Sequence, residues 1–145
     1  MNTAQEAPRG AAERLAAGAI RKGFQLEALH TYTDCNGKAL YWRIRAKHPV
    51  TGEKWIRPMT LSADGYMLGE PQVDAFPNGK PLYLLHEIAA WPDEVVIVTE
   101  GEHKADKLAE LGLLVTTSGG ADSAHKADWQ PLAGRSVMIW PDNGT

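Results

Sequence analysis

Cysteine, long apolar runs and excess positive charge are all scarce in this chain of 145 residues. The single cysteine, Cys35, excludes an intramolecular disulfide and any zinc ribbon built from cysteines of this chain. No stretch approaches the ~20 consecutive apolar residues of a membrane span. The N-terminal segment 1–20 also lacks the apolar core of a secretory signal. We therefore expect a cytoplasmic protein with no membrane partner.

The overall charge gives no sign of nucleic-acid binding. The net charge is −3, so such binding has to come from a local basic patch. The five histidines are scattered without the spacing of metal ligands. An apolar content of 43% is enough for a packed core, and the length suits one domain or a small domain plus part of another.

The N-terminal half is expected to form a helix followed by a small antiparallel sheet. Residues 1–10 are polar and are expected to be disordered, whereas the Ala-rich segment 11–20 predicts a helix that Gly23 ends. Between residues 29 and 69 the apolar period changes to two, which is typical of half-buried strands. The predicted turns are Asp34-Cys-Asn-Gly37, Pro49-Val-Thr-Gly52 and Asp64-Gly65.

Positively charged side chains are expected to gather on one side of this sheet. The strand 40–47 alternates apolar residues with aromatic and basic ones. The predicted nucleic-acid-binding side chains are Arg43, Arg45 and Lys47, with Lys54 and Arg57 from the next strand and Tyr41 and Trp55 beside them. Cations beside stacking aromatics suit single-stranded nucleic acid. The alternative is an ordinary solvated sheet face.

Apolar strands alternate with helices in the C-terminal part, which indicates an α/β fold. Val95-Val-Ile-Val-Thr99 is apolar on both faces, as in a central parallel strand. A helix over 102–111 and a strand over 113–117 are predicted next, then a short helix over 124–129 and a strand over 137–140. We expect an N-terminal tail and helix (1–28), an antiparallel β region with a linker (29–80) and a partial parallel α/β sheet (81–145).

Two acidic residues follow two of these strands, Glu100 the first and Asp142 the last. Right-handed crossovers bring the carboxyl ends of parallel strands to one edge, so the two carboxylates could share a Mg²⁺ there. Asp106 is a candidate third metal-site acid, and Lys104 is a candidate phosphate contact. Each of the four could instead be an ordinary turn or surface residue.

Four blocks of the C-terminal part, in this order, carry a resemblance to a known family. They are residues 96–113 (VIVTEGEHKADKLAELGL), 116–121 (TTSGGA), 128–135 (DWQPLAGR) and 139–143 (IWPDN). Together they resemble the Toprim domain, and most closely the Toprim of primase-helicase proteins from phages, plasmids and integrated elements. Residues 32–38 and 81–87 are also similar to the region upstream of Toprim in those proteins.

The resemblance implies a DNA primase that transfers nucleotides on a single-stranded DNA template with Mg²⁺, next to a replicative helicase. It makes Glu100 the catalytic glutamate of the family, placed to act as a general acid/base or as a group next to the metal, and Asp142 the first aspartate of an Asp-x-Asp metal motif. The second position of that motif is Gly144, which offers no ligand side chain. The family domain also continues with a further strand and helix. We therefore expect weak or absent Mg²⁺ binding and negligible primer synthesis by this chain alone.

A second hypothesis is a non-catalytic binding module of a mobile genetic element. Such a module would act on single-stranded DNA, a replication complex or a host defence complex. A fragment of a Toprim nuclease or topoisomerase is a third possibility.

Overall fold

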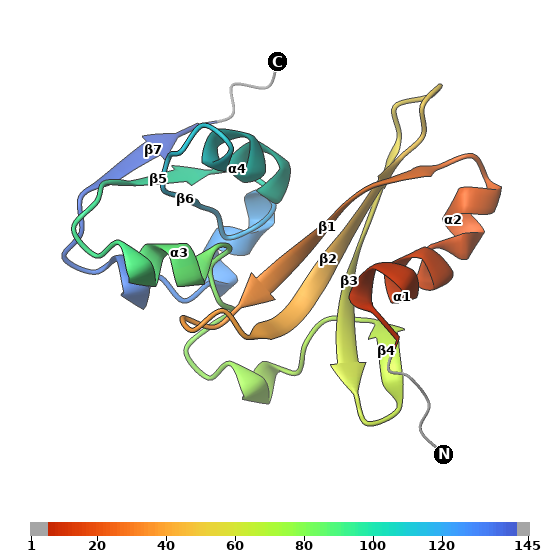
Figure 1. The fold of residues 1–145 in the computed structure, drawn as a ribbon, viewed down its shortest axis with the longest axis horizontal. Helices are drawn as coiled ribbons and strands as arrows, with labels where there is room; N and C mark the ends of the chain where they lie inside the picture. Colours follow the sequence, from red (N-terminus) through yellow and green to blue (C-terminus); the bar gives the residue numbers. More distant parts are fainter. Residues whose placement is uncertain (1–5, 142–145) are drawn as a thin grey trace. The chain divides into compact units, whose positions relative to one another are not determined.

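The computed structural model describes residues 6–141 and shows a mixed α/β protein, as the sequence predicted (Figure 1). Its contacts divide the chain into two compact units. Unit 1 comprises Met1–Thr31 and Tyr41–Pro71, and unit 2 comprises Tyr32–Leu40 and Gln72–Thr145. Residues 32–40, which the sequence pattern groups with the antiparallel region, thus pack with the C-terminal part.

Two short helices begin unit 1. They are α1 (Pro8–Leu15) and α2 (Ala17–Arg21), where the sequence predicts a single helix over 11–20. The expectation of disorder is wrong for residues 8–10, because proline has no N–H to satisfy and therefore suits the first turn of a helix. Gly23 ends α2 as predicted: its φ is 100°, and the next N–H, that of Phe24, donates to the Ala19 carbonyl.

An antiparallel sheet of four strands follows, in the order β1-β2-β3-β4. Its strands are β1 (Gln25–Thr33), β2 (Ala39–Lys47), β3 (Lys54–Ser62) and β4 (Gly65–Leu68). The predicted turns join these strands. In the first turn, the Asp34 carboxylate accepts hydrogen bonds from the backbone N–H groups of Asn36 and Lys38. In unit 1, Ala11 and Ala12 of α1 pack on a buried cluster formed by Trp42, Ile44 and Met59.

Unit 2 contains a parallel sheet in the order β6-β5-β7. The central strand is β5 (Val96–Thr99), which is buried at every position, so the predicted central parallel strand is confirmed. α4 (Glu102–Ala109) connects it to β6 (Val115–Thr116), and β7 (Val137–Trp140) has the predicted bounds. The predicted helix over 124–129 is instead a 3₁₀ turn, η2 (Ala121–Lys126).

The remaining elements of unit 2 are η1 (Val73–Ala75), α3 (Leu85–Ala90) and η3 (Gln130–Leu132). Arg135 holds the last turn of α3 and the segment after it in place, because its guanidinium donates hydrogen bonds to the carbonyls of Ile88, Trp91 and Glu94. Within residues 6–141, no helix is both long enough and apolar enough to cross a membrane.

Candidate functional site

The three parallel strands of unit 2 end at one edge of their sheet, which we call the carboxyl edge. Glu100 directly follows the buried strand β5 at this edge, and its side chain is exposed. The strand partner of Thr99, the last residue of β5, is Trp140, the last residue of β7. The two strands therefore end side by side at the carboxyl edge. Asp142 and Gly144 lie outside the described residues.

Backbone hydrogen bonds fix the turn that carries Glu100. Gly101 has a φ of 83°, a conformation that glycine adopts without steric cost. Its N–H donates to the Gly119 carbonyl at 2.8 Å and lies 3.1 Å from the Thr117 hydroxyl. A separate hydrogen bond of 2.6 Å, from the Thr116 hydroxyl to the Tyr83 carbonyl, joins β6 to the segment before α3. The loop after β6 therefore holds the turn between β5 and α4 at the carboxyl edge.

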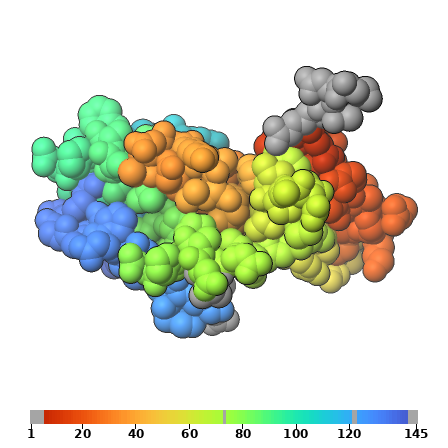
Figure 2. Space-filling view, turned by 90° about the horizontal axis from the view of Figure 1, so that it is seen from below, coloured from red at the N-terminus to blue at the C-terminus, as the bar shows by residue number. Residues whose placement is uncertain are grey.

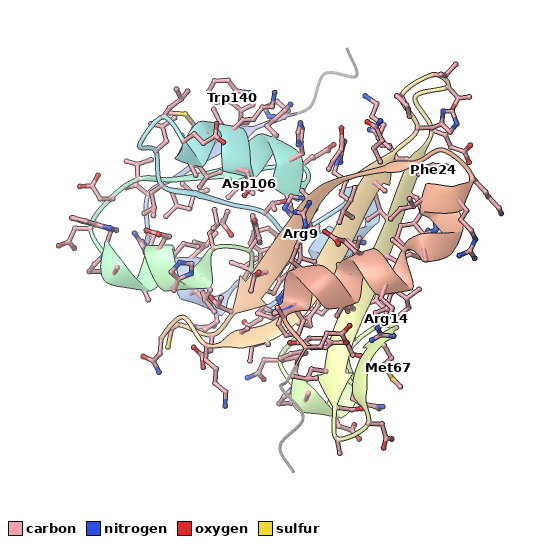
Figure 3. All side chains as sticks on the ribbon, turned by 45° about the vertical axis from the view of Figure 1, so that its right-hand side comes forward. Arg9, Arg14, Phe24, Met67, Asp106 and Trp140 are labelled. Carbon is pink, nitrogen blue, oxygen red and sulfur yellow. The ribbon has the colours of Figure 1, made fainter. Side chains whose placement is uncertain are left out.

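The acidic side chain that points inward at this edge is Glu102, not Glu100. Glu102 is 7% exposed and accepts a hydrogen bond of 2.5 Å from the hydroxyl of Tyr32, which is itself 1% exposed. One turn further along α4, Asp106 accepts a hydrogen bond of 2.7 Å from the Tyr83 hydroxyl (Figure 3 labels Asp106). The Tyr32 and Tyr83 rings pack with their centroids 5.2 Å apart. We call these four residues the tyrosine–carboxylate cluster.

The structure gives Asp106 a different role from the predicted one. The sequence makes it a candidate metal-site acid, but in the structure one of its oxygens is occupied by a phenol donor. Burial, and then the hydrogen bond to Asp106, raise the pKa of Tyr83, so this phenol keeps its proton and its role as donor. The arrangement is that of a buried polar network that positions α4, rather than of a ligand set that faces solvent.

The described residues do not assemble a magnesium site. Mg²⁺ prefers several oxygen ligands in octahedral geometry. Among the side chains that the structure describes, which do not include that of Asp122, no three of His, Cys, Asp or Glu are placed to hold a metal ion. Glu100 is exposed at the carboxyl edge, and the next two acids of the α4 face, Glu102 and Asp106, bind tyrosine hydroxyls. Lys104, the predicted phosphate contact, is half-buried on α4.

Sequence reasoning missed Tyr32, Tyr83 and Glu102. Tyr32 and Glu102 are 70 positions apart, so no local pattern links them. The sequence analysis singled out the segments that contain the two tyrosines, residues 32–38 and 81–87, but it assigned no role to the tyrosines themselves. The structure gives these two segments a physical connection to α4 in unit 2.

The predicted nucleic-acid-binding residues of unit 1 divide between the two faces of the sheet. In the register of β2 and β3, Lys47 lies opposite Lys54 and Arg45 opposite Ile56, whereas Arg57 lies opposite the buried Ile44. Residues directly opposite each other share a face. One face therefore carries Arg43, Arg45, Lys47 and Lys54, which we call the cationic face.

Arg57 lies on the other face, together with Trp55, and its guanidinium is 4.9 Å from the centre of the Trp55 ring. The sequence was enough to predict that Lys54 and Arg57 lie on opposite faces. Side chains alternate between the two faces along a strand, and these two residues are an odd number of positions apart. Within the cationic face, Arg45 is paired with Glu27 at 2.8 Å, which offsets part of its charge.

Comparisons with protein-family models, with curated proteins and with solved structures found no match to this chain.

Proposed function

We propose that this chain is the nucleic-acid-binding part of a Toprim-type primase-helicase and that it does not synthesise primers by itself. The observation that carries the proposal is the exposed Glu100 at the end of a buried central strand, with β7 parallel to it in register. Ligands of open α/β sheets bind beyond the carboxyl ends of the strands, where Glu100 lies. The order of strand, Glu-Gly turn, helix, strand and Gly-rich loop also agrees with the ordered blocks that carry the resemblance.

The incomplete ligand set is the reason for expecting no independent catalysis. A two-metal or one-metal nucleotidyl transfer needs carboxylates that bring a cation to the reacting phosphate. The described carboxylates of α4 are engaged by Tyr32 and Tyr83 instead. The hydrogen bonds of Tyr32 and Tyr83 hold α4 and the turn before it in place, and this turn exposes Glu100 to solvent.

Primer synthesis on single-stranded DNA with Mg²⁺ or Mn²⁺ tests this proposal. We expect the full chain to give no product above background. Product that disappears in a Glu100→Gln variant and persists in Glu110→Gln would refute the second half of the proposal. Glu110 is the matched control, because it is an exposed glutamate at the other end of α4.

The cationic face is the part of the chain that we propose to contact single-stranded DNA. Lys47 and Lys54 are exposed and lie directly opposite each other on β2 and β3. Two like charges in this position repel each other, and a bound phosphate would relieve the repulsion. Because this contact needs no metal ion, binding should survive chelation by EDTA.

A fluorescent oligothymidine titrated with the full chain at several salt concentrations tests this contact. The double variant Lys47→Ala/Lys54→Ala should bind more weakly, and the slope of log K against log salt should become shallower by about 0.7 for each phosphate that is no longer neutralised. The control is Lys22→Ala, since Lys22 is an exposed lysine at the end of α2. Equal binding by the double variant and the control, or loss of wild-type binding in EDTA, would contradict the proposal.

A further inference from the structure

Most aromatic rings of unit 1 pack between its helices and the sheet, on the face opposite the cationic face. Phe24 and Trp42 belong to buried clusters that contain alanines of α2 and α1, respectively. Trp55 and Tyr66 are half-buried and pack against these clusters. Figure 2 shows the red atoms of α1 against the yellow-green atoms of β4, the strand that carries Tyr66. These rings therefore contribute to the core of unit 1 and do not line the cationic face.

The two aromatic residues that the sequence predicts beside the basic side chains are not available for stacking. Trp55 lies opposite the buried Ala46, which places it on the helix-covered face, and the Arg57 guanidinium lies over its ring at 4.9 Å. A nucleobase on this ring would have to displace either Arg57 or the packed cluster. Tyr41 shares the parity of Arg43 along β2, but it is only 4% exposed. Among the described residues of unit 1, none therefore offers an aromatic ring to a base on the cationic face.

The cationic face instead presents a row of separated positive charges. Side chains on one face of a strand follow each other at about 6.6 Å, so Arg43, Arg45 and Lys47 form a row of about 13 Å along β2. Lys47 and Lys54 are exposed at one end of this row, and the β3 residues opposite Arg45 and Arg43 are aliphatic. The face therefore offers charges to phosphates and no ring on which a base can stack.

Given the proposed contact of this face with DNA, on which this inference rests, we propose that the cationic face binds the phosphate backbone without stacking any base. Proteins that bind single strands combine a positively charged surface with aromatic side chains on which successive bases stack. Without such rings, the cationic face has no means to favour unpaired bases. A duplex also carries about one phosphate charge per 1.7 Å of its axis, which is twice the charge density of either of its strands. The cationic face should therefore bind double-stranded DNA at least as tightly as single strands.

Fluorescence anisotropy with three ligands of equal length tests this inference. The ligands are oligothymidine, an abasic oligomer with the same number of phosphates, and a duplex, each titrated with the full chain in EDTA at one salt concentration. We expect the abasic oligomer to bind within about fivefold of oligothymidine, because a single stacked base would contribute about fivefold or more to the affinity. The duplex should bind at least as tightly as oligothymidine. This comparison changes the ligand and not the protein, so it does not depend on how variants fold.

The lysine variants separate a failure of this inference from a failure of the proposed function. Lys47→Ala/Lys54→Ala should weaken binding to all three ligands by a similar factor, and the exposed control Lys22→Ala should change none of them. Oligothymidine binding that depends on the two lysines, together with more than about fivefold weaker binding of the abasic oligomer or the duplex, would overturn this inference alone. Absence of binding to all three ligands would refute the proposed DNA contact, and this inference with it.

The salt dependence gives a second measurement. The logarithm of the binding constant falls linearly with the logarithm of the salt concentration, and extrapolation to 1 M salt removes most of the phosphate contribution. We expect the extrapolated binding constants of oligothymidine and the abasic oligomer to agree within about fivefold. A residual affinity at 1 M salt for oligothymidine alone would reveal contacts to the bases and would overturn the inference.

Discussion

Removing the Tyr32 hydroxyl is a direct test of the tyrosine–carboxylate cluster. Tyr32→Phe keeps the ring and its packing against Tyr83, and deletes one hydrogen bond to the carboxylate of Glu102. Both residues are buried, with exposed fractions of 1% and 7%. A hydrogen bond to a charged group contributes about 1.5–3 kcal/mol, and removing the donor from a buried carboxylate should cost a free energy of unfolding in that range.

The assay combines urea unfolding, followed by circular dichroism, with amide hydrogen exchange of the peptide that contains α4. The second measurement is needed because unit 1 and unit 2 need not unfold together. We expect faster exchange across Glu102–Ala109 in Tyr32→Phe. The matched control is Tyr66→Phe in unit 1, since Tyr66 is half-buried and its ring packs against Trp42. We expect the control to change stability by less than about 0.5 kcal/mol.

A double-mutant cycle with Glu102→Gln assigns the effect to the pair. If Tyr32 stabilises unit 2 through Glu102, the two substitutions should show a coupling energy of about 1 kcal/mol or more. A Tyr32→Phe variant as stable as Tyr66→Phe, or a coupling energy near zero, would refute the claim that this hydrogen bond holds α4.

Three further substitutions test other parts of unit 2. Arg135→Met removes three hydrogen bonds to backbone carbonyls and should lower the free energy of unfolding by about 3 kcal/mol, measured by urea unfolding. Gly79→Ala would place a Cβ 2.8 Å from the Ala127 backbone at a φ of 115°, and thermal unfolding should show a loss of about 3 kcal/mol or more, against about 1–2 kcal/mol for the unobstructed Gly37→Ala. The raised pKa of Tyr83 means that the unfolded chain loses this proton more readily than the folded one, so the stability that Tyr83 contributes is complete below about pH 10 and declines above it. Wild-type stability should therefore fall more steeply than that of Tyr83→Phe between about pH 9 and 11, and parallel curves would contradict this assignment.

Much of the secondary structure followed from short-range patterns. The alternation in 40–47 predicted β2, and the continuous apolar run before Glu100 predicted a central parallel strand that the structure confirms as β5. Helix bounds were less accurate, since α1 begins at Pro8 and α4 ends at Ala109. The start of α1 was placed too late because proline suits the first turn of a helix, whereas the end of α4 was misplaced because the last turn of a helix depends on tertiary contacts more than on propensity.

The candidate site was only partly accessible to sequence reasoning. The apolar period of the strands and the alternation of strands and helices along the chain were enough to place Glu100 at the end of a parallel strand. Strand direction and right-handed connections follow from the order of neighbouring elements. They could not show that Asp106 binds Tyr83 or that Glu102 is buried against Tyr32. Those contacts join positions 23 and 70 residues apart, and the packing of unit 2 brings them together.

The sequence by itself determined which segments are strands, which residue follows the central strand and which side chains alternate on β2 and β3. Only the tertiary structure decided the chain segments that form each compact unit, the partners of the α4 carboxylates and the burial of the aromatic rings of unit 1. The physical reason is that backbone periodicity is fixed by neighbours along the chain, whereas burial and hydrogen-bond partners are fixed by residues distant in sequence that fold into contact.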